Sequence, residues 1–363
     1  MSQLTIEQKI GQLFFIGIGG PELDPATRKL IDTIQPGGVC LFARNIRERR
    51  QTRDLLDGLR EALPITPLLS VDQEGGLVDR LRRVMTPMPA ANTLRCADDA
   101  AKLGGIIGES LRILGFNMDF APVVDVMDDE RAKFSNGLHS RAFGKSKEDV
   151  VAFSTAFLNS LQEAGIIGCL KHFPGLGASE VDSHKELPTV STSETQFSDV
   201  DLYPYKHLLR SGAVHAVMIA HAAFPNVRLQ EKDQNGKLLP SSLSPAIIST
   251  LLRSELGFDG LAITDDLEMG AIVENYDIGD ACRLALEAGA DMLAICASSE
   301  RIERGFSSLV DAVANRKLEE ATIDRSIDRI DAVRDSLQPP RAFDDKRIDE
   351  LSDEIIRLNE QLN

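Results

Sequence analysis

Eight short apolar segments recur along the chain, separated by stretches long enough to hold a helix. They lie at 13–18, 38–42, 67–71, 117–124, 166–170, 216–220, 260–264 and 291–296. Segments of this length and composition are typical of buried strands, and helical periodicity fills the stretches between them. Strands that alternate with helices form a parallel sheet, and eight of them favour a closed barrel over an open doubly wound sheet. We therefore predict an α/β fold, a single-domain (β/α)8 barrel of the TIM type.

The C-terminal part of the chain has a different pattern. Residues 1–300 contain all the strand-like segments and should form the barrel, whereas residues 301–363 have helical periodicity at 302–314, 322–337 and 344–362. These helices carry no catalytic pattern, so we expect them to pack on the barrel and not to form an independent domain. The last helix could cover the barrel's own flank or a second subunit. We expect a monomer or a weak homodimer.

Charge and cysteine content limit the partners and the compartment. The chain has 40 basic and 56 acidic side chains, a formal net charge of −16, which disfavours nucleic acid and anionic membranes as partners. The longest uncharged stretch, 211–227, contains two histidines and a proline, so membrane insertion is not expected. Five scattered cysteines without CxxC spacing indicate neither a disulfide framework nor a zinc knuckle. With no signal-peptide pattern, a cytoplasmic location is the simplest expectation.

Polar residues follow five of the predicted strands directly. In chain order they are Asp72-Gln73-Glu74, Asp125, Lys171-His172, His221 and Asp265-Asp266. The carboxyl ends of barrel strands meet on one rim, where active sites are built, so these residues should converge on one pocket. Any one of them alone would more often be a solvated turn residue. Five together indicate a functional site.

The loop after the fifth strand contains a second cluster of titratable groups. Asp182 and His184 are two residues apart, which places them on the same side of a locally extended backbone. An imidazole has an ordinary pKa near ~6.5 and exchanges protons readily near neutrality, so a neighbouring carboxylate would make a coupled acid/base pair. A lone loop histidine is usually only a surface residue, and the spacing by itself leaves both interpretations open.

Six motifs together carry a family resemblance. They are Val-Asp-Gln-Glu-Gly-Gly at 71–76, Ala-Pro-Val-Val-Asp-Val at 121–126, Ser-Arg-Ala-Phe-Gly at 140–144, Lys-His-Phe-Pro-Gly at 171–175, Asp-Ser-His at 182–184 and Thr-Asp-Asp-Leu at 264–267. In this order they resemble glycoside hydrolase family 3, and most nearly its β-N-acetylhexosaminidase branch. The resemblance covers about residues 5–296.

The resemblance implies a retaining glycosidase that removes terminal, non-reducing β-linked N-acetylglucosamine, with peptidoglycan fragments as substrates and no cofactor. Asp265 matches the family's nucleophile, a choice over Asp266 that strand alternation alone does not make. Asp266 fits better as a cap on the following helix. His184 matches the acid/base residue and Asp182 its partner.

The resemblance also assigns five residues to substrate binding. The matching positions are Asp72, Arg80, Arg141, Lys171 and His172. Asp72 could accept hydrogen bonds from sugar hydroxyls, and the Lys171-His172 pair could donate them. Without the resemblance, the two arginines would be interpreted as surface ion-pair residues, which is the commoner role of an arginine.

Two positions depart from the family pattern, and three alternative functions stay open. Leu176 replaces a common histidine and Leu77 a common arginine, which bears on the substrate more than on the reaction type. A phosphorylase that transfers the sugar to phosphate is the first alternative, and a catalytically weak carbohydrate-binding protein is the second. The third, a metal-dependent barrel hydrolase, lacks the usual HxH and HExxH spacings. We expect no metal.

Overall fold

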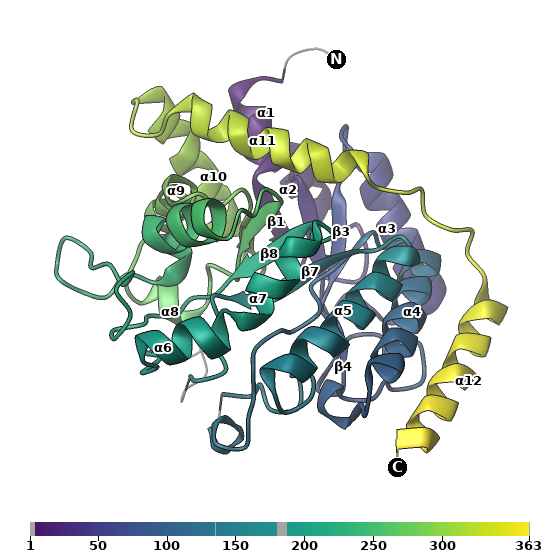
Figure 1. Ribbon diagram of the computed structural model, residues 1–363. Helices are drawn as coiled ribbons and strands as arrows, with labels where there is room; N and C mark the ends of the chain where they lie inside the picture. Colours follow the sequence, from purple (N-terminus) through teal and green to yellow (C-terminus); the bar gives the residue numbers. More distant parts are fainter. Residues whose placement is uncertain (1–3, 135, 180–186, 363) are drawn as a thin grey trace.

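The computed structural model describes residues 4–134, 136–179 and 187–362 and contains the predicted barrel (Figure 1). Eight parallel strands are ordered β10-β1-β2-β3-β6-β7-β8-β9. They span β1 Phe14–Gly17, β2 Gly38–Leu41, β3 Leu68–Val71, β6 Met118–Asp119, β7 Ile167–Phe173, β8 Ala216–Ile219, β9 Leu261–Thr264 and β10 Leu293–Ile295. A bridge between Ile263 and Met292 brings the last two strands together and closes the sheet. All eight predicted strands are confirmed.

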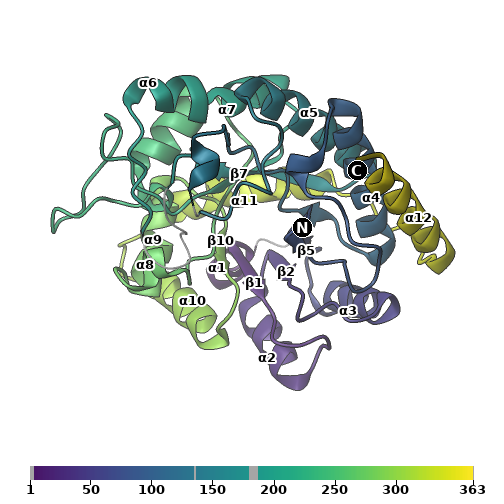
Figure 2. The same cartoon turned by 90° about the horizontal axis from the view of Figure 1, so that it is seen from below.

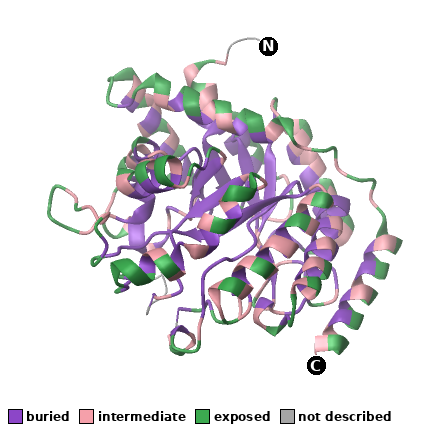
Figure 3. Cartoon of the chain, viewed as in Figure 1, coloured by how far each residue is buried: buried purple, intermediate pink, exposed green. Residues whose placement is uncertain are grey.

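The strands are short and buried on both faces, so their sequences are continuous apolar runs and do not alternate between apolar and polar residues. Figure 3 shows the buried strands at the centre and the exposed residues on the outer helices. The helical segments span α1 Ile6–Gln12, α2 Pro25–Ile34, α3 Arg49–Ala62, α4 Ala97–Leu114, α5 Lys147–Glu163, α6 Glu194–Gln196, α7 Tyr203–Leu208, α8 Gly270–Val273, α9 Ile278–Ala288 and α10 Ser299–Ala314, with further helical turns at Phe197–Asp201 and Ala246–Glu255. Figure 2 shows them as a ring around the strands.

One helix covers the end of the barrel where the strands begin. Helix α11, Glu320–Asp335, crosses that end in Figure 1. Its Arg334 donates to the side chain of Gln12, just before β1, and to the carbonyl oxygen of Thr66, just before β3. The amino ends of the strands are therefore covered. The opposite rim, where the strands end, is left for a functional site.

The last helix lies on the outside of the barrel. Helix α12, Asp345–Leu362, packs against α4 and buries Ile348, Leu351, Ile355 and Leu358. The predicted C-terminal helices thus agree with α10, α11 and α12 to within three residues at their starts. The division at residue 300, the independence of the C-terminal helices and the oligomeric state stay predictions. Within the described residues, no helix has the length and apolarity needed to cross a membrane.

A small hairpin on the catalytic rim was not predicted. Its strands are β4, Gln73–Gly75, and β5, Val78–Asp79, joined through Gly75 and Gly76 with φ of 89° and 57°. Glycine adopts this left-handed region without the strain that a side chain would add. Gln73 Nε2 donates to Asp79 Oδ1 at 2.9 Å and holds the hairpin closed. The hairpin fixes Glu74 and Arg80 beside the barrel opening.

Candidate active site

The predicted convergence of five strand-end groups on one pocket is confirmed in part: Asp72, Lys171-His172 and Asp265-Asp266 line it, whereas Asp125 and His221 do not and instead contact His172 and the carbonyl oxygen of Asp266. A single pocket at the carboxyl ends of the strands is lined by Asp72, Arg80, Arg141, Lys171, His172, Asp265 and Asp266. These residues come from the ends of three strands (β3, β7 and β9), from the end of the β4–β5 hairpin and from the segment before α5. Asp182 and His184 lie outside the described residues, so their predicted roles stay predictions.

Lys171 lies almost fully buried at the end of β7. Its Nζ is 2.6 Å from Asp72 Oδ1 and 2.6 Å from Glu74 Oε1. Burial opposes the charge, but the two carboxylates outweigh it and raise the pKa of the ammonium above its ordinary value. Lys171 is therefore a fixed cation that can orient Asp72 and donate to a sugar hydroxyl.

Glu74 joins two of the predicted sugar-binding cations; the sequence pattern placed it on the rim but gave it no role. Besides Lys171, it accepts from Arg141 Nε at 2.8 Å and from Arg141 Nη2 at 2.9 Å. Burial pushes the pKa of Glu74 up, but the two cations lower it to about 2. The carboxylate is thus charged and holds Lys171 and Arg141 in one arrangement. The only sequence signal was its place after a strand end, which it shares with Gln73.

His172 is oriented by Asp125, the residue that the sequence placed after the fourth strand. The Nδ1 of His172 is 2.8 Å from Asp125 Oδ2. An ionised carboxylate only accepts, so Nδ1 carries the proton of this pair. The Nε2 of His172 lies 3.4 Å from Arg141 Nη2. When the ring is neutral, Nε2 can only accept a hydrogen bond, and it donates to a ligand only when the ring is protonated.

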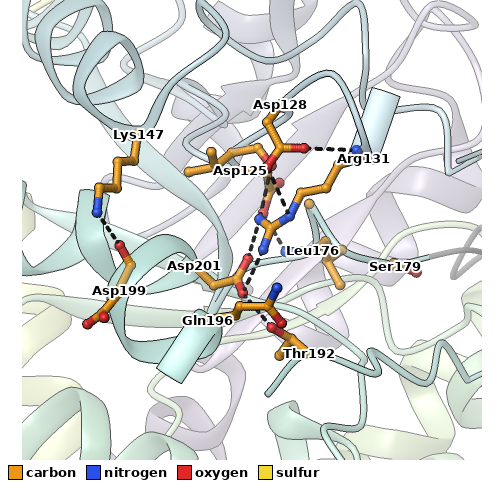
Figure 4. Close-up of polar contacts among 12 residues, drawn as sticks. Asp125, Asp128, Arg131, Lys147, Leu176, Ser179, Thr192, Gln196, Asp199 and Asp201 are labelled. Carbon is orange, nitrogen blue, oxygen red and sulfur yellow. Dashed lines mark hydrogen bonds and ion pairs between the residues drawn. The ribbon is translucent and has the colours of Figure 1, made fainter. Parts of the chain in front are cut away.

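The same Asp125 fixes the start of the loop that leads to residue 179. Its Oδ1 accepts from the backbone N–H of Leu176 at 2.6 Å. Figure 4 shows the support behind this contact, where Arg131 pairs with Asp201 at 2.7 Å. Burial raises the pKa of Asp201 to about 6 although Arg131 opposes the rise. Asn136 Nδ2 donates to the carbonyl oxygen of Ser179 at 2.8 Å, so the described end of the loop is held from two sides.

The two family departures occupy different surroundings. Leu176 is buried and lines the pocket, so an apolar group stands in the pocket wall where the family commonly has a histidine. Leu77 is 72% exposed at the tip of the β4–β5 hairpin and does not line the pocket. Within the described part of the chain, the Nε of Arg80 has no hydrogen-bond partner. Arg80 lines the pocket, but this Nε is buried from solvent.

The two aspartates after β9 have opposite environments. Burial raises the pKa of Asp265, but His172, His221, the N–H of Asp266 and Lys171 outweigh it and hold the pKa below its ordinary value. The N–H of Asp266 donates to Asp265 Oδ1 at 2.8 Å. Burial raises the pKa of Asp266 to about 7. Asp265 is thus ionised at neutral pH, whereas Asp266 is about half protonated.

His221 supports this pair from the end of β8. The ring is buried, with Nε2 3.0 Å from the carbonyl oxygen of Asp266 and Nδ1 2.7 Å from Ser242 Oγ. A carbonyl only accepts, so Nε2 carries a proton. His221 therefore orients the backbone of the two aspartates, and both of its ring nitrogens have protein partners. Across the described ranges, no cluster of three or more His, Cys, Asp or Glu side chains could hold a metal ion.

Comparison with known proteins supports the family resemblance of the six motifs. The glycosyl hydrolase family 3 N-terminal domain matches residues 5–333. The chain is 33% identical over 298 residues to a β-hexosaminidase of Pseudomonas aeruginosa, covering 81% of this chain and 85% of that protein. It is 31% identical to β-hexosaminidase A of Pseudoalteromonas piscicida, covering 85% of this chain but only 54% of that longer protein.

A solved structure extends the likeness to the whole fold. It is a glycoside hydrolase family 3 β-N-acetylglucosaminidase from Paenibacillus sp. str. FPU-7, with a TM-score of 0.88 and 34% sequence identity. The match covers 98% of this chain and 69% of that one. Fold, family match and sequence identity agree with the resemblance seen in the six motifs. The chain belongs to glycoside hydrolase family 3.

Proposed function

We propose that this protein is a retaining β-N-acetylhexosaminidase that removes terminal, non-reducing β-linked N-acetylglucosamine, with peptidoglycan-derived muropeptides as its natural substrates. The sugar is supported by the relatives that are named β-hexosaminidase and by the Paenibacillus enzyme named β-N-acetylglucosaminidase. The muropeptide substrate rests on the motif resemblance alone. The activity of the whole protein is part of the proposal, because one of these relatives is much longer than this chain.

The observation that carries the proposal is the contrast between Asp265 and Asp266. A retaining glycosidase needs an ionised carboxylate that attacks the anomeric carbon and forms a glycosyl ester. Asp265 has that state in the pocket, with a pKa below its ordinary value, while the pKa of Asp266 is about 7. In our assignment Asp265 is the nucleophile. Asp266, about half protonated at neutral pH, limits the negative charge beside it.

The reaction then proceeds by double displacement. Asp265 bonds to the anomeric carbon as the bond to the leaving oxygen breaks, and His184 gives that oxygen a proton. Water next attacks the glycosyl ester, His184 takes the water's proton, and the sugar is released with Asp265 restored. Asp182 orients the imidazole. The roles of His184 and Asp182 are assigned from the family resemblance alone.

The remaining residues of the pocket bind the sugar. Asp72 accepts from hydroxyl groups while Lys171 donates to them, and the 2.6 Å contact between the two keeps their charges balanced. Arg141 is held by Glu74, and Arg80 lines the same pocket. Such fixed partners hold a ligand with little loss of their own freedom.

The test is initial-rate kinetics on an aryl N-acetyl-β-glucosaminide and on the matching aryl β-glucoside, each with and without phosphate. Wild type should act on the acetamido sugar whether or not phosphate is present. Asp265→Asn should lose nearly all turnover, because an amide does not form the glycosyl ester. A mass-spectrometric search for a glycosyl adduct on Asp265, with a slow fluorinated substrate, tests the covalent intermediate directly.

The matched control is Asp266→Asn, the same change one residue along, which keeps the neutral state of that side chain and should retain most of the activity. Phosphate-dependent release of a sugar 1-phosphate would replace the hydrolase with the phosphorylase. Binding of N-acetylglucosamine with no turnover by wild type would favour a carbohydrate-binding protein. Equal losses in the Asp265 and Asp266 variants would remove the nucleophile assignment.

A further inference from the structure

Two thiols line the pocket, and the proposed reaction uses neither of them. Cys40 lies in β2 and Cys296 directly after β10, and both are buried side chains of the wall that also contains Asp72. Cys40 Sγ makes a 3.8 Å contact with the carbonyl oxygen of Leu41 and also interacts with the side chain of Ser70. Such contacts are weak, so the sulfur remains available to another partner.

The strand register brings the two thiols together. Strand β1 lies between β10 and β2, and its Gly17 pairs with Cys40 while Ile16 pairs with Ile295. Cys296 follows Ile295, where the pairing of β10 with β1 ends, so Cys40 and Cys296 both lie next to Gly17, a row that we define by these three residues. Parallel neighbours in register point to the same side of a sheet, here into the barrel. Gly17 contributes no side chain to this row, so nothing from β1 separates the two sulfurs.

The backbone at this point is closely packed. A Cβ placed on Gly17 would lie 2.0 Å from the carbonyl oxygen and 2.9 Å from the Cα of Cys296, so Cys296 lies directly over the glycine. Arg44 fixes this approach, since its Nη2 donates to the carbonyl oxygen of Cys296 at 2.7 Å and its Nε to that of Ile18 at 3.0 Å. The row is thus held by contacts independent of any sugar.

The thiols lie beside charged groups of the pocket. Burial raises the pKa of Cys296, and Asp266, Cys40 and Asp72 raise it further. Burial and Asp72 likewise raise the pKa of Cys40. Protonated thiols of this kind are poor nucleophiles. Arg80 and Lys171 oppose the effect of Asp72 at Cys40, so the preference for a ligand rests on the two sulfurs and not on the charge around them.

We propose that Cys40 and Cys296 form a binding site for a soft cation of linear, two-coordinate geometry, such as copper(I) or silver(I). Soft thiolate ligands select such ions, whereas zinc needs about four ligands. Across the described ranges no group of three or more His, Cys, Asp or Glu side chains forms a larger cluster here. On binding, each S–H bond releases its proton to solvent and each sulfur bonds to the ion, with no change of oxidation state. The bound ion lies beside Asp72 and excludes the sugar, a consequence that rests on the proposed function.

Binding is tested by calorimetric titration with silver(I) in chloride-free buffer, in a Cys96→Ser background that removes the exposed thiol. One equivalent should bind tightly. Cys40→Ser and Cys296→Ser should each weaken binding by at least the roughly 10–100-fold that loss of an outer-sphere partner costs a metal site. The matched control is Cys282→Ser, a buried cysteine that does not line the pocket, which should leave binding unchanged. Binding should tighten as pH rises, because two protons are released.

Kinetics supply the second measurement. Silver(I) should inhibit the Cys96→Ser enzyme, N-acetylglucosamine should protect it, and the Cys40→Ser enzyme should resist inhibition. Tight binding that persists in the Cys40→Ser/Cys296→Ser double variant, or that is lost in Cys282→Ser, would overturn the site. Alanine variants with an unchanged thermal melt replace any serine variant that misfolds. If no glycosidase activity exists, the calorimetric result still decides on the cation site.

Discussion

The charge state of each carboxylate in the pocket depends on neighbours that are distant in sequence. Glu74 and Asp266 both follow strand ends, yet one pKa is lowered to about 2 and the other raised to about 7. Glu74 contacts Lys171 and Arg141, whereas Asp266 has burial and the negative Glu268 and Asp265 around it. The sequence predicted which residues meet, because strand ends share one rim. It did not predict these charge states, because they depend on which cation reaches which carboxylate.

Glu74→Gln should weaken both folding and substrate binding. The substitution leaves the buried Lys171 and Arg141 without a shared counter-charge, which should lower the free energy of unfolding at pH 7 by about 3 kcal/mol. The folded pKa of about 2 lies below the ordinary 4.5. Glu74 therefore stabilises wild type above pH 4.5, and this contribution is lost as pH falls toward 2. In the Glu74→Gln variant, the free energy of unfolding should lack this dependence on pH.

Urea unfolding at several pH values between 3 and 7 measures this effect. Glu130→Gln is the matched control, because Glu130 forms an exposed ion pair with Lys133 and should contribute about 0–1 kcal/mol. In kinetics, Glu74→Gln should raise KM more than it lowers kcat, since Glu74 holds the sugar-binding cations. A variant as stable as Glu130→Gln, with wild-type KM, would contradict the role given to Glu74.

Asp266→Asn should become more stable than wild type as the solution becomes alkaline. The carboxyl has a folded pKa of about 7 and an ordinary value of 3.8, so the folded state binds more protons between these values. Wild type therefore loses stability as pH rises from about 4 through 7, whereas an amide does not titrate. Asn can still accept from the N–H of Glu268, which is 3.0 Å from Oδ1.

The measurement is the difference in free energy of unfolding between the Asp266→Asn variant and wild type, at pH 5 and at pH 8. Other titrating groups are common to both proteins and cancel in the difference. The difference should grow in favour of the variant toward pH 8. A constant difference across this range would show that Asp266 titrates near its ordinary pKa.

At the scale of elements, long periodic segments were predicted well and very short ones were not. The eight strands and the C-terminal helices follow from apolar runs and helical periodicity. The β4–β5 hairpin has strands of three and two residues, too short to give a pattern. Strand β7 extends to Phe173, beyond the predicted end at residue 170, because carboxylates from other segments compensate Lys171 and pair with His172.

Helix α12 should depend on one apolar face for its attachment. Leu351 is 1% exposed against α4, so Leu351→Ala should cost about 2–3 kcal/mol of local stability. The substitution should lower the free energy needed for α12 to detach, and not that of global unfolding, because α12 joins the barrel only through the extended segment 337–344. Tryptic cleavage at Arg341 should accelerate in the variant. Ile356→Ala, on the same helix but 44% exposed, should cleave at the wild-type rate, and equal rates in the two variants would contradict the packing.

At the scale of the whole molecule, the number of strands was predictable but the means of closing the barrel was not. The closing strands β9 and β10 are joined by Asp291, whose Oδ2 accepts from the N–H of Ala262 at 2.8 Å and from Arg253 at 2.5 Å. Its Oδ1 accepts from Arg329 of α11 at 3.2 Å. These partners span 76 positions of sequence between Arg253 and Arg329, and no local pattern indicates them.

Asp291→Asn should therefore destabilise the whole barrel. Burial raises the pKa of Asp291 against the opposing effect of Arg253, so the ionised carboxylate gains little net energy from the pair. Removing the charge nevertheless leaves the guanidinium of Arg253 buried without a counter-charge. This should lower the free energy of unfolding by about 3 kcal/mol. The matched control is Asp259→Asn, which removes the exposed second partner of Arg329 and should cost about 0–1 kcal/mol. Global urea unfolding measures both variants. If they lose equal stability, the barrel closes through its apolar core alone, and Asp291 only accommodates the arginines around it.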